Sequence, residues 1–258
     1  MADELEAAIE TARAAGEVLR AGFGRGGKVR YKGEVDLVTE TDEESERLIK
    51  EALLGAFPAY GMLAEESGQT AGEDEARWIV DPLDGTINFA HDLPIFAVSI
   101  ALQRGDDLVL GVVYDPMRDE LFTARRGEGA FLNGKPITPT KTGELIHALL
   151  ATGFPYDRSE LPEALEFFGR FASRTRSIRR LGSAAIDLCY VACGRLDGYY
   201  ERGVWPWDVA AGALILEEAG GRVTDYRGDP PDVEDREILA SNGPLHQGML
   251  EVIGNTSG

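Results

Sequence analysis

The chain has 258 residues, of which 43% are hydrophobic and 28% are charged, the composition of a globular protein large enough to bury a core of its own. Its formal net charge at pH 7 is −19, and its pI is about 4.6. A surface this acidic repels nucleic-acid backbones and offers no polybasic contact to a membrane, so we expect neither as a direct partner. An anionic substrate would need local cations to overcome the field of the whole protein.

The sequence predicts a soluble, cytoplasmic protein. The N-terminal residues Met1-Ala-Asp-Glu-Leu lack the pattern of a signal peptide. No apolar run approaches the ~20 residues that span a bilayer. Cys189 and Cys193 stand in an apolar run and form no C-x-x-C pair, so we expect two reduced, buried thiols rather than a zinc or redox site.

The first 60 residues predict two helices with a short strand between them. Apolar residues recur at helical spacing over 3–22. A strand is predicted at 36–39. Thr41-Asp-Glu-Glu44 has the spacing of a capping box and predicts a second helix through about Ala56, ended by Pro58.

Short apolar runs separated by turn residues predict a sheet over 60–135. Asp115-Pro-Met-Arg-Asp119 and Asn133-Gly134 are the predicted hairpin connections within it. The predicted strands of this part are 62–64, 78–80, 95–103, 108–114 and 120–124.

The rest of the chain alternates strands with helices, a pattern that lays helices on a sheet. We expect a seam near residue 140, between an N-terminal α+β half over 1–140 and a C-terminal α/β half over 141–258 that form one functional unit. The predicted strands after the seam are 149–152, 177–181, 196–200 and 222–225, and the predicted helices are 162–172, 183–193 and 208–219.

Three groups of carboxylates lie at the ends of apolar elements, either directly after a strand or at the start of a helix. Asp81-Pro-Leu-Asp84 ends an apolar strand in a turn that Gly85 permits, with the amides of Gly85 and Thr86 available beside it. The second group is Glu65-Glu-Ser67, and the third is Asp208 at the start of a helix. Taken singly, these are ordinary turn chemistry, a solvated loop and a helix N-cap.

Together the three groups indicate a metal site. Carboxylates held close together repel one another by about 4 kcal/mol per pair at intermediate dielectric, and bound cations remove that repulsion. Oxygen ligands without His or Cys favour Mg²⁺, Mn²⁺ or Ca²⁺ over zinc. The 3 histidines are scattered and form no Ser-His-Asp pattern, so the sequence does not predict a covalent intermediate.

These motifs and their order resemble the inositol monophosphatase family. The residues that carry the resemblance are Asp36-Leu-Val-Thr-Glu-Thr-Asp42, Glu65-Glu-Ser67, Asp81-Pro-Leu-Asp-Gly-Thr-Ile-Asn88, Leu181-Gly-Ser-Ala-Ala185, Tyr199-Tyr-Glu201 and Trp207-Asp-Val-Ala-Ala-Gly212 with Glu218-Ala-Gly-Gly221. The resemblance runs over roughly 5–253. It implies an α/β fold, a layered αβαβα sandwich with an antiparallel sheet in the first half and a second, mixed sheet in the C-terminal half.

The resemblance also implies a set of metal ligands, most of them in the N-terminal half. Glu66, Asp81 and the backbone carbonyl of Leu83 would hold a first Mg²⁺. Asp81, Asp84 and Asp208 would hold a second. A third, weaker ion would contact Glu66, and Mn²⁺ could replace Mg²⁺.

Catalytic and substrate-binding roles follow from the same resemblance. Thr86 with Glu66 would orient the attacking water, and Asp42 would support that network. The amides of Gly85 and Thr86 would bind the phosphate. The polyol hydroxyls would be contacted by Asp84, the backbone of Ala184, Glu201 and Asp208. Lys32 resembles a loop lysine of the family and, with Glu34, would tune the response to lithium.

The implied function is Mg²⁺-dependent hydrolysis of inositol monophosphate to inositol and phosphate by metal-activated water, in a lithium-sensitive homodimer. A first alternative is a broader phosphatase of the same fold, acting on sugar phosphates, fructose bisphosphate, histidinol phosphate or a nucleotide phosphate. Glu201 beside Tyr199-Tyr200 resembles the inositol branch and favours the first reading. A second alternative is a non-catalytic regulatory interaction protein, which the complete carboxylate set disfavours, since an unused site would be free to lose groups that repel one another.

Overall fold

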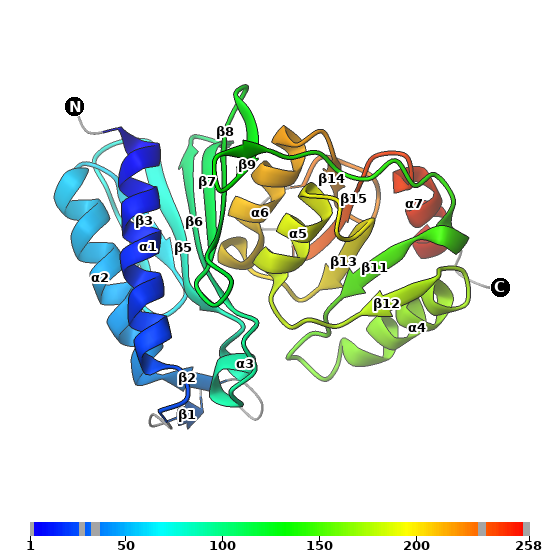
Figure 1. The fold of residues 1–258 in the computed structure, drawn as a ribbon, viewed down its shortest axis with the longest axis horizontal. Helices are drawn as coiled ribbons and strands as arrows, with labels where there is room; N and C mark the ends of the chain where they lie inside the picture. The colour runs from blue at the N-terminus through cyan, green and yellow to red at the C-terminus, as the bar shows by residue number, and fades with distance from the viewer. Residues whose placement is uncertain (1–2, 26–28, 32–36, 232–235, 255–258) are drawn as a thin grey trace.

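The computed structural model describes residues 3–25, 29–31, 37–231 and 236–254. Its elements form five layers, which follow one another from left to right in Figure 1 as helices, a large sheet, helices, a smaller sheet and helices. The predicted αβαβα sandwich is therefore confirmed. Lys32, Glu34 and Asp36 lie outside the described residues.

The outer helical layer consists of α1 (Glu4–Gly22) and α2 (Glu40–Ala56). The side chain of Thr39 caps α2 by accepting hydrogen bonds from the amides of Thr41 and Asp42, while the amide of Thr39 donates to Asp42. The capping box thus begins at Thr39 and not, as predicted, at Thr41. The reason is that strand β2 (Leu37–Thr39), which pairs with β1 (Val29–Tyr31), leads straight into the helix.

The first large sheet has the strand order β10-β9-β8-β7-β6-β5-β3-β4. All neighbours are antiparallel except β3 and β5, which run parallel. The sheet predicted as antiparallel is therefore mixed, because the chain reverses once into β4 at the sheet edge and once more before β5. Its strands are β3 (Gly61–Ala64), β4 (Gly68–Thr70), β5 (Ala76–Asp84), β6 (Ala97–Arg104), β7 (Asp107–Asp115), β8 (Glu120–Arg125), β9 (Gly129–Leu132) and β10 (Lys135–Pro136).

The central helices α5 (Ala184–Ala192) and α6 (Pro206–Glu218) belong to the second half of the chain, yet α6 packs against the first sheet. A Cβ added to Gly111 of β7 would lie 2.7 Å from the carbonyl oxygen of Ala211 in α6, so this glycine allows the close contact. Cys189 of α5 is buried, whereas Cys193 is only half-buried, because it lies just past the end of the helix.

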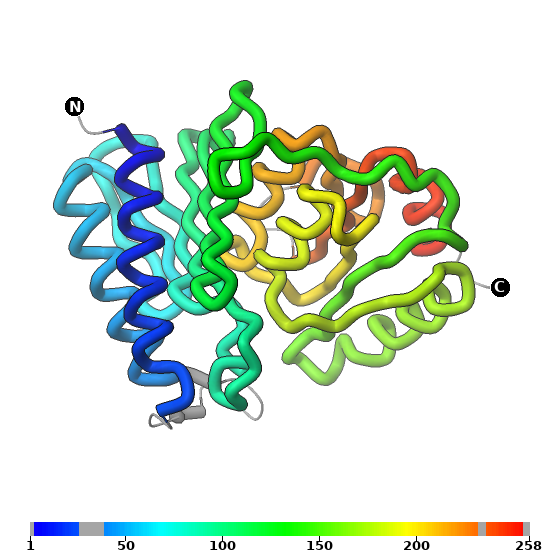
Figure 2. The backbone as a smooth tube through the Cα atoms, in the orientation of Figure 1, coloured from blue at the N-terminus to red at the C-terminus, as the bar shows by residue number. Residues whose placement is uncertain are grey.

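The second large sheet has the order β12-β11-β13-β15-β14 and is mixed, as predicted. Its strands are β11 (Leu149–Thr152), β12 (Ser177–Arg179), β13 (Gly198–Arg202), β14 (Arg222–Thr224) and β15 (Glu237–Ser241). The last layer contains α4 (Leu161–Ala172) and α7 (His246–Gly254). Figure 2 shows the long connection that follows β10, including the short 3-10 helix Leu145–His147, running from the first sheet to β11.

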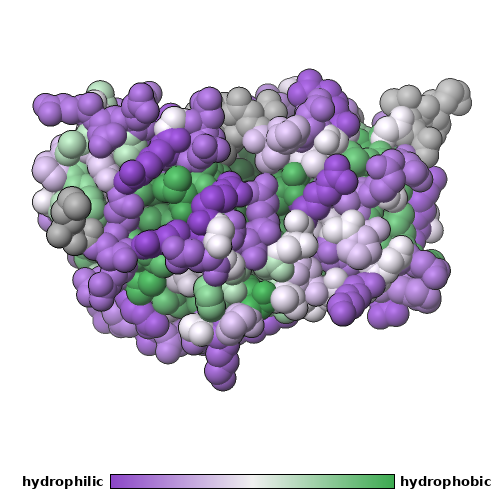
Figure 3. Space-filling model, turned by 90° about the horizontal axis from the view of Figure 1, so that it is seen from above, coloured by the Kyte–Doolittle hydropathy of each residue, from purple (hydrophilic) through white to green (hydrophobic). Residues whose placement is uncertain are grey.

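Three clusters of buried apolar side chains fill the spaces between these layers. The largest lies around α5 and α6, between the two sheets. The face drawn in Figure 3 is mostly hydrophilic, in agreement with the charge of −19. Within the described ranges, no helix combines the length and the apolar character needed to cross a bilayer.

Candidate active site

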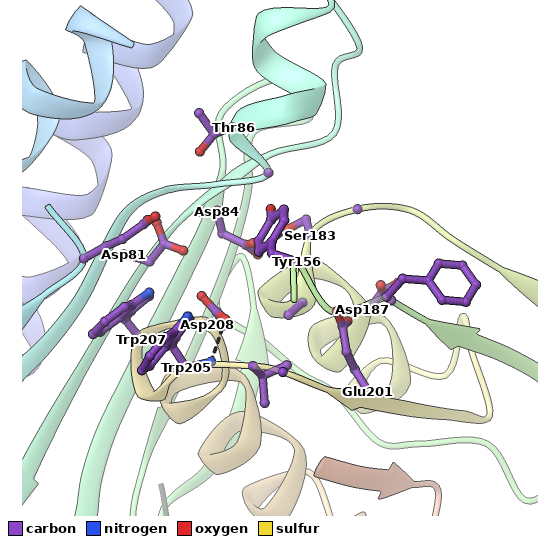
Figure 4. A pocket seen from close by; sticks show the side chains of 18 of the residues that line it. Asp81, Asp84, Thr86, Tyr156, Ser183, Asp187, Glu201, Trp205, Trp207 and Asp208 are labelled. Carbon is purple, nitrogen blue, oxygen red and sulfur yellow. Dashed lines mark hydrogen bonds between the residues drawn. The ribbon is translucent and has the colours of Figure 1, made fainter. Parts of the chain in front are cut away.

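A pocket of about 240 Å³ lies where the end of β5 meets α5, α6 and β13. Most of the residues predicted for the site line it, namely Asp81, Leu83, Asp84, Gly85, Thr86, Ala184, Glu201 and Asp208. They come from both parts of the chain, because the second half contributes α5, β13 and α6 to one wall (Figure 4). Glu66 and Asp42 do not line the pocket.

Asp81 and Asp84 both reach the pocket because β5 is irregular between them. Residues three apart on a regular strand point to opposite faces of a sheet. Here the register with β6 shifts between Asp81 and Asp84, around Pro82. The amide of Leu83 donates to Asp81 at 2.9 Å, which fixes this carboxylate in the turn.

Gly85 has φ +96° and precedes the short helix α3 (Thr86–Ala90), which the sequence analysis left undefined. A Cβ at this position would lie 2.9 Å from the carbonyl oxygen of Ile95 and 3.2 Å from that of Gly182. The left-handed backbone and the lack of space both require glycine. The tight turn brings Thr86 into the pocket beside Asp84.

Asp84 joins the end of β5 to the start of α5. Its Oδ2 accepts hydrogen bonds from the hydroxyl of Ser183 at 2.5 Å and from the amide of Ala185 at 2.8 Å. Burial raises the pKa of Asp84 to about 6, although these hydrogen bonds favour the charged form.

Asp208 is the third residue of α6 rather than its N-cap, because the helix begins at Pro206. Its Oδ2 accepts a hydrogen bond of 2.8 Å from the amide of Trp205. Desolvation in the pocket raises the pKa of Asp208 well above its usual value, and the negative charges of Asp84 and Glu65 raise it further.

Of the two consecutive glutamates after β3, Glu65 lines the pocket and the predicted Glu66 does not. Glu65 follows β3 directly, and its amide donates to the carbonyl of Val80 at 3.2 Å. It lines the pocket, and after burial its charge is the strongest influence that raises the pKa of Asp81. The amide of Glu66 instead bonds Glu46 of α2 at 2.8 Å. Both glutamates lie in the turn between β3 and β4, and this turn directs Glu65, but not Glu66, to the pocket.

Asp42 lies behind the pocket wall and contacts it through Thr86. The carboxylate is fully buried, and its Oδ1 lies 3.2 Å from the hydroxyl of Thr86. That hydroxyl also lies 3.0 Å from the carbonyl oxygen of Leu83. Burial raises the pKa of Asp42. Thr86 and Asp42 thus form a buried hydrogen-bonded link between the pocket wall and the start of α2.

The wall opposite Asp81 carries Glu201, whose Oε2 accepts a hydrogen bond of 2.5 Å from the hydroxyl of Tyr199. Burial raises the pKa of Glu201 to about 7. The sequence analysis missed several lining residues here, among them Arg180, Asp187, Tyr156 and Trp205. An acidic residue inside the apolar run that forms α5 was the one available signal, and it points to Asp187.

The donor set of this pocket fits a hard divalent cation. Glu65, Asp81, Asp84 and Asp208 supply only carboxylate oxygens, and no His or Cys side chain lines the pocket. Within the described residues, no three His, Cys, Asp or Glu side chains already converge as a ready-made metal cage. The aspartates are held instead by the hydrogen bonds given above. Burial, followed by the charges of Glu65, Asp84 and Asp208, raises the pKa of Asp81, and a bound cation would relieve the repulsion among these carboxylates.

Comparison with known proteins agrees with this fold. The sequence profile of the inositol monophosphatase family matches residues 1–256. "Inositol-1-monophosphatase" of Synechocystis sp. is 46% identical over 255 residues, covering 98% of this chain and 89% of the relative. "Nus factor SuhB" of Pasteurella multocida is 45% identical over 253 residues, covering 96% and 95%. The crystal structure of the extragenic suppressor protein suhB from Bartonella henselae superposes with a TM-score of 0.94 at 39% identity, covering 98% of each chain.

The full-length match and the layered fold around a carboxylate pocket show that the chain belongs to the inositol monophosphatase family. It is accordingly an enzyme of the phosphatase class.

Proposed function

We propose that this chain is a Mg²⁺-dependent phosphomonoesterase that hydrolyses inositol monophosphate to inositol and phosphate. The observation that carries the proposal is that four carboxylates, those of Glu65, Asp81, Asp84 and Asp208, line one pocket beside the Gly85 turn. Such a set is suited to hard cations, and the pocket of about 240 Å³ would hold a six-membered polyol ring and its phosphate.

The metal ligands would be Glu65, Asp81, Asp84, Asp208 and the backbone carbonyl of Leu83, with Glu65 in the role that the sequence analysis gave to Glu66. Burial raises the pKa of Asp81 most, and the charges of Glu65, Asp84 and Asp208 raise it further, so all three carboxylates act on this residue. Bound Mg²⁺ supplies Lewis-acid chemistry, which neutralises phosphate oxygens and lowers the pKa of water.

Thr86 and Asp42 would orient the attacking water. The Thr86 hydroxyl faces the pocket and is held between Asp42 and the carbonyl of Leu83. When this hydroxyl donates its proton to either oxygen, its lone pairs accept a hydrogen bond from water in the pocket. The buried carboxylate of Asp42 therefore sets the direction of the Thr86 hydroxyl rather than touching the substrate itself.

The phosphate would lie against the amides of Gly85 and Thr86 at the start of α3, and the polyol against the opposite wall. Its hydroxyls would contact Asp84, the backbone of Ala184, Glu201 and Asp208. Arg180 lines the same pocket and lowers the pKa of Asp84, so it provides the local positive charge that an anionic substrate needs on an acidic protein.

The test is phosphate release from a panel of inositol 1-phosphate, fructose 1,6-bisphosphate, histidinol phosphate and 2′-AMP, with Mg²⁺ and after exhaustive chelation. We expect the highest kcat/KM on inositol 1-phosphate, no activity after chelation and recovery with Mg²⁺ or Mn²⁺. A higher kcat/KM on another ester would establish the broader phosphatase instead. Full activity after chelation would contradict the metal assignment.

The non-catalytic alternative keeps a specific motivation, since a 45% identical relative carries the name Nus factor SuhB. It predicts no metal-dependent phosphate release from any ester in the panel. We further propose a cytoplasmic homodimer that is inhibited by lithium and uses neither nucleic acid nor membrane as a partner. Sedimentation of the purified protein tests the oligomeric state.

A further inference from the structure

Asp187 is a pocket residue that the proposed mechanism leaves without a role. It lies in the first turns of α5 and is 1% exposed. Its Oδ1 is buried and has no hydrogen-bond partner in the part of the chain that the structure describes. A buried carboxylate oxygen without a donor is unfavourable, and native proteins rarely keep one without a reason.

The charged groups that act on Asp187 are two further carboxylates and one guanidinium. The pKa of Asp187 is raised well above the usual range by burial and then by the charges of Glu201 and Asp84, which are two further acceptors. Arg180 acts in the opposite direction through its charge. In Figure 4, Asp187 and Glu201 lie together on the side of the pocket away from Asp81. The wall that would face the polyol therefore presents two adjacent carboxylates.

The two carboxylates of this pair differ in the hydrogen-bond donors that the protein gives them. Glu201 is held by the hydroxyl of Tyr199, so one of its oxygens already has a donor. No donor among the described residues holds Oδ1 of Asp187, so this carboxylate can turn toward a ligand in the pocket that it lines. Hydroxyl groups of a polyol are such donors, and a site built to accept them discriminates strongly against ligands that lack them.

We propose that Asp187 is a specificity-determining residue whose carboxylate accepts a hydrogen bond from a ring hydroxyl of the polyol phosphate, next to the hydroxyl bound by Glu201. This inference rests on the proposed phosphatase function and deepens it. The substrate class it defines is a phosphate monoester with at least two neighbouring hydroxyls on the side remote from the phosphate.

The experiment compares kcat/KM on inositol 1-phosphate with kcat/KM on phenyl phosphate, whose leaving group carries no further hydroxyl. We expect Asp187→Ala to lower the ratio of the two values by about 10- to 100-fold, the range for a lost hydrogen bond to a charged group. Asp187→Asn should retain most of the ratio, because its amide oxygen still accepts. If Asp187→Ala does not fold, Asp187→Ser replaces it, since its hydroxyl is too short to reach the same group.

Ile186→Val is the matched control, because Ile186 is buried in the same helix but does not line the pocket. It should leave the ratio unchanged. A ratio unchanged in Asp187→Ala, or an equal fall on both substrates, overturns the role of Asp187 while the phosphatase assignment stands. A wild-type protein that releases phosphate from neither ester overturns the proposed function and this inference with it.

Discussion

Replacing Gly85 by alanine tests whether the turn after β5 requires glycine for two reasons, its left-handed backbone conformation and the lack of space for a Cβ. The new methyl group would meet a left-handed φ of +96°, which costs an L-residue about 1–2 kcal/mol. It would also lie 2.9 Å from the carbonyl oxygen of Ile95, a backbone atom that cannot turn away. Overpacking of this kind costs about 1–3 kcal/mol. The free energy of unfolding should therefore fall by about 2–5 kcal/mol.

Gly220→Ala separates the two contributions. Gly220 has φ +95°, and a Cβ there would have no neighbour within 4 Å. This variant should lose only the backbone term of about 1–2 kcal/mol and keep full activity, because Gly220 lies at the end of α6 outside the pocket. Gly85→Ala should in addition lose activity by about 100-fold, since the shift displaces Thr86 from its position.

Urea unfolding followed by the fluorescence of the 3 tryptophans, together with phosphate release, measures both effects. The reasoning is refuted if Gly85→Ala is no less stable than Gly220→Ala. It is equally refuted if Gly85→Ala retains wild-type kcat/KM.

Three further predictions concern the pocket and a buried histidine. Asp81→Asn should lower kcat/KM by more than about 100-fold on both inositol 1-phosphate and phenyl phosphate. Glu201→Gln should lower kcat/KM by about 5- to 100-fold on inositol 1-phosphate alone. Equal losses in the two variants would contradict these roles. LiCl should inhibit phosphate release in an uncompetitive or mixed manner, because Li⁺ resembles Mg²⁺ in size but carries half the charge. Asp84→Asn should be less sensitive to LiCl. No inhibition beyond that of a KCl control at high millimolar LiCl would contradict the predicted lithium sensitivity. Burial lowers the pKa of His246 to about 4, so its contribution to stability is present above pH 6.5 and is lost as the pH falls toward 4. Relative to His246→Gln, the wild type should lose about 1.4 kcal/mol per pH unit in that window, up to about 3 kcal/mol, and parallel stability curves for the two proteins would exclude this role.

Local features of this protein were predictable from the sequence. The helices over 3–22 and 162–172 were read from apolar periodicity and lie within a residue of α1 and α4. The Asn133-Gly134 turn joins β9 to β10 with φ of +49° and +74°, as its two residue types favour. The carboxylates of Asp81, Asp84 and Asp208 were found because each stands at the end of an apolar element. In all these cases the determining contacts lie within a few residues.

The C-terminal elements show where local pattern failed. β15 and α7 were not predicted, although β15 is a central strand of the second sheet. His246 in α7 was expected to be one of several scattered histidines, yet it is fully buried between hydroxyls of Thr224 and Ser241 at 2.9 Å each. Both partners come from strands of the second sheet, so only the assembled sheet defines this environment.

The tertiary structure alone decided which side chains of each motif reach the pocket. Glu65 and Glu66 are equivalent in the sequence, and the point where β3 ends selects Glu65. Asp42 meets Thr86 across 44 residues, and Asp187 joins Glu201 only because α5 and β13 share one wall. A side chain's direction depends on strand register and on packing between distant elements, whereas its chemical type is fixed by the sequence. The sequence therefore determined the chemistry available to this protein, and the fold determined which groups act together.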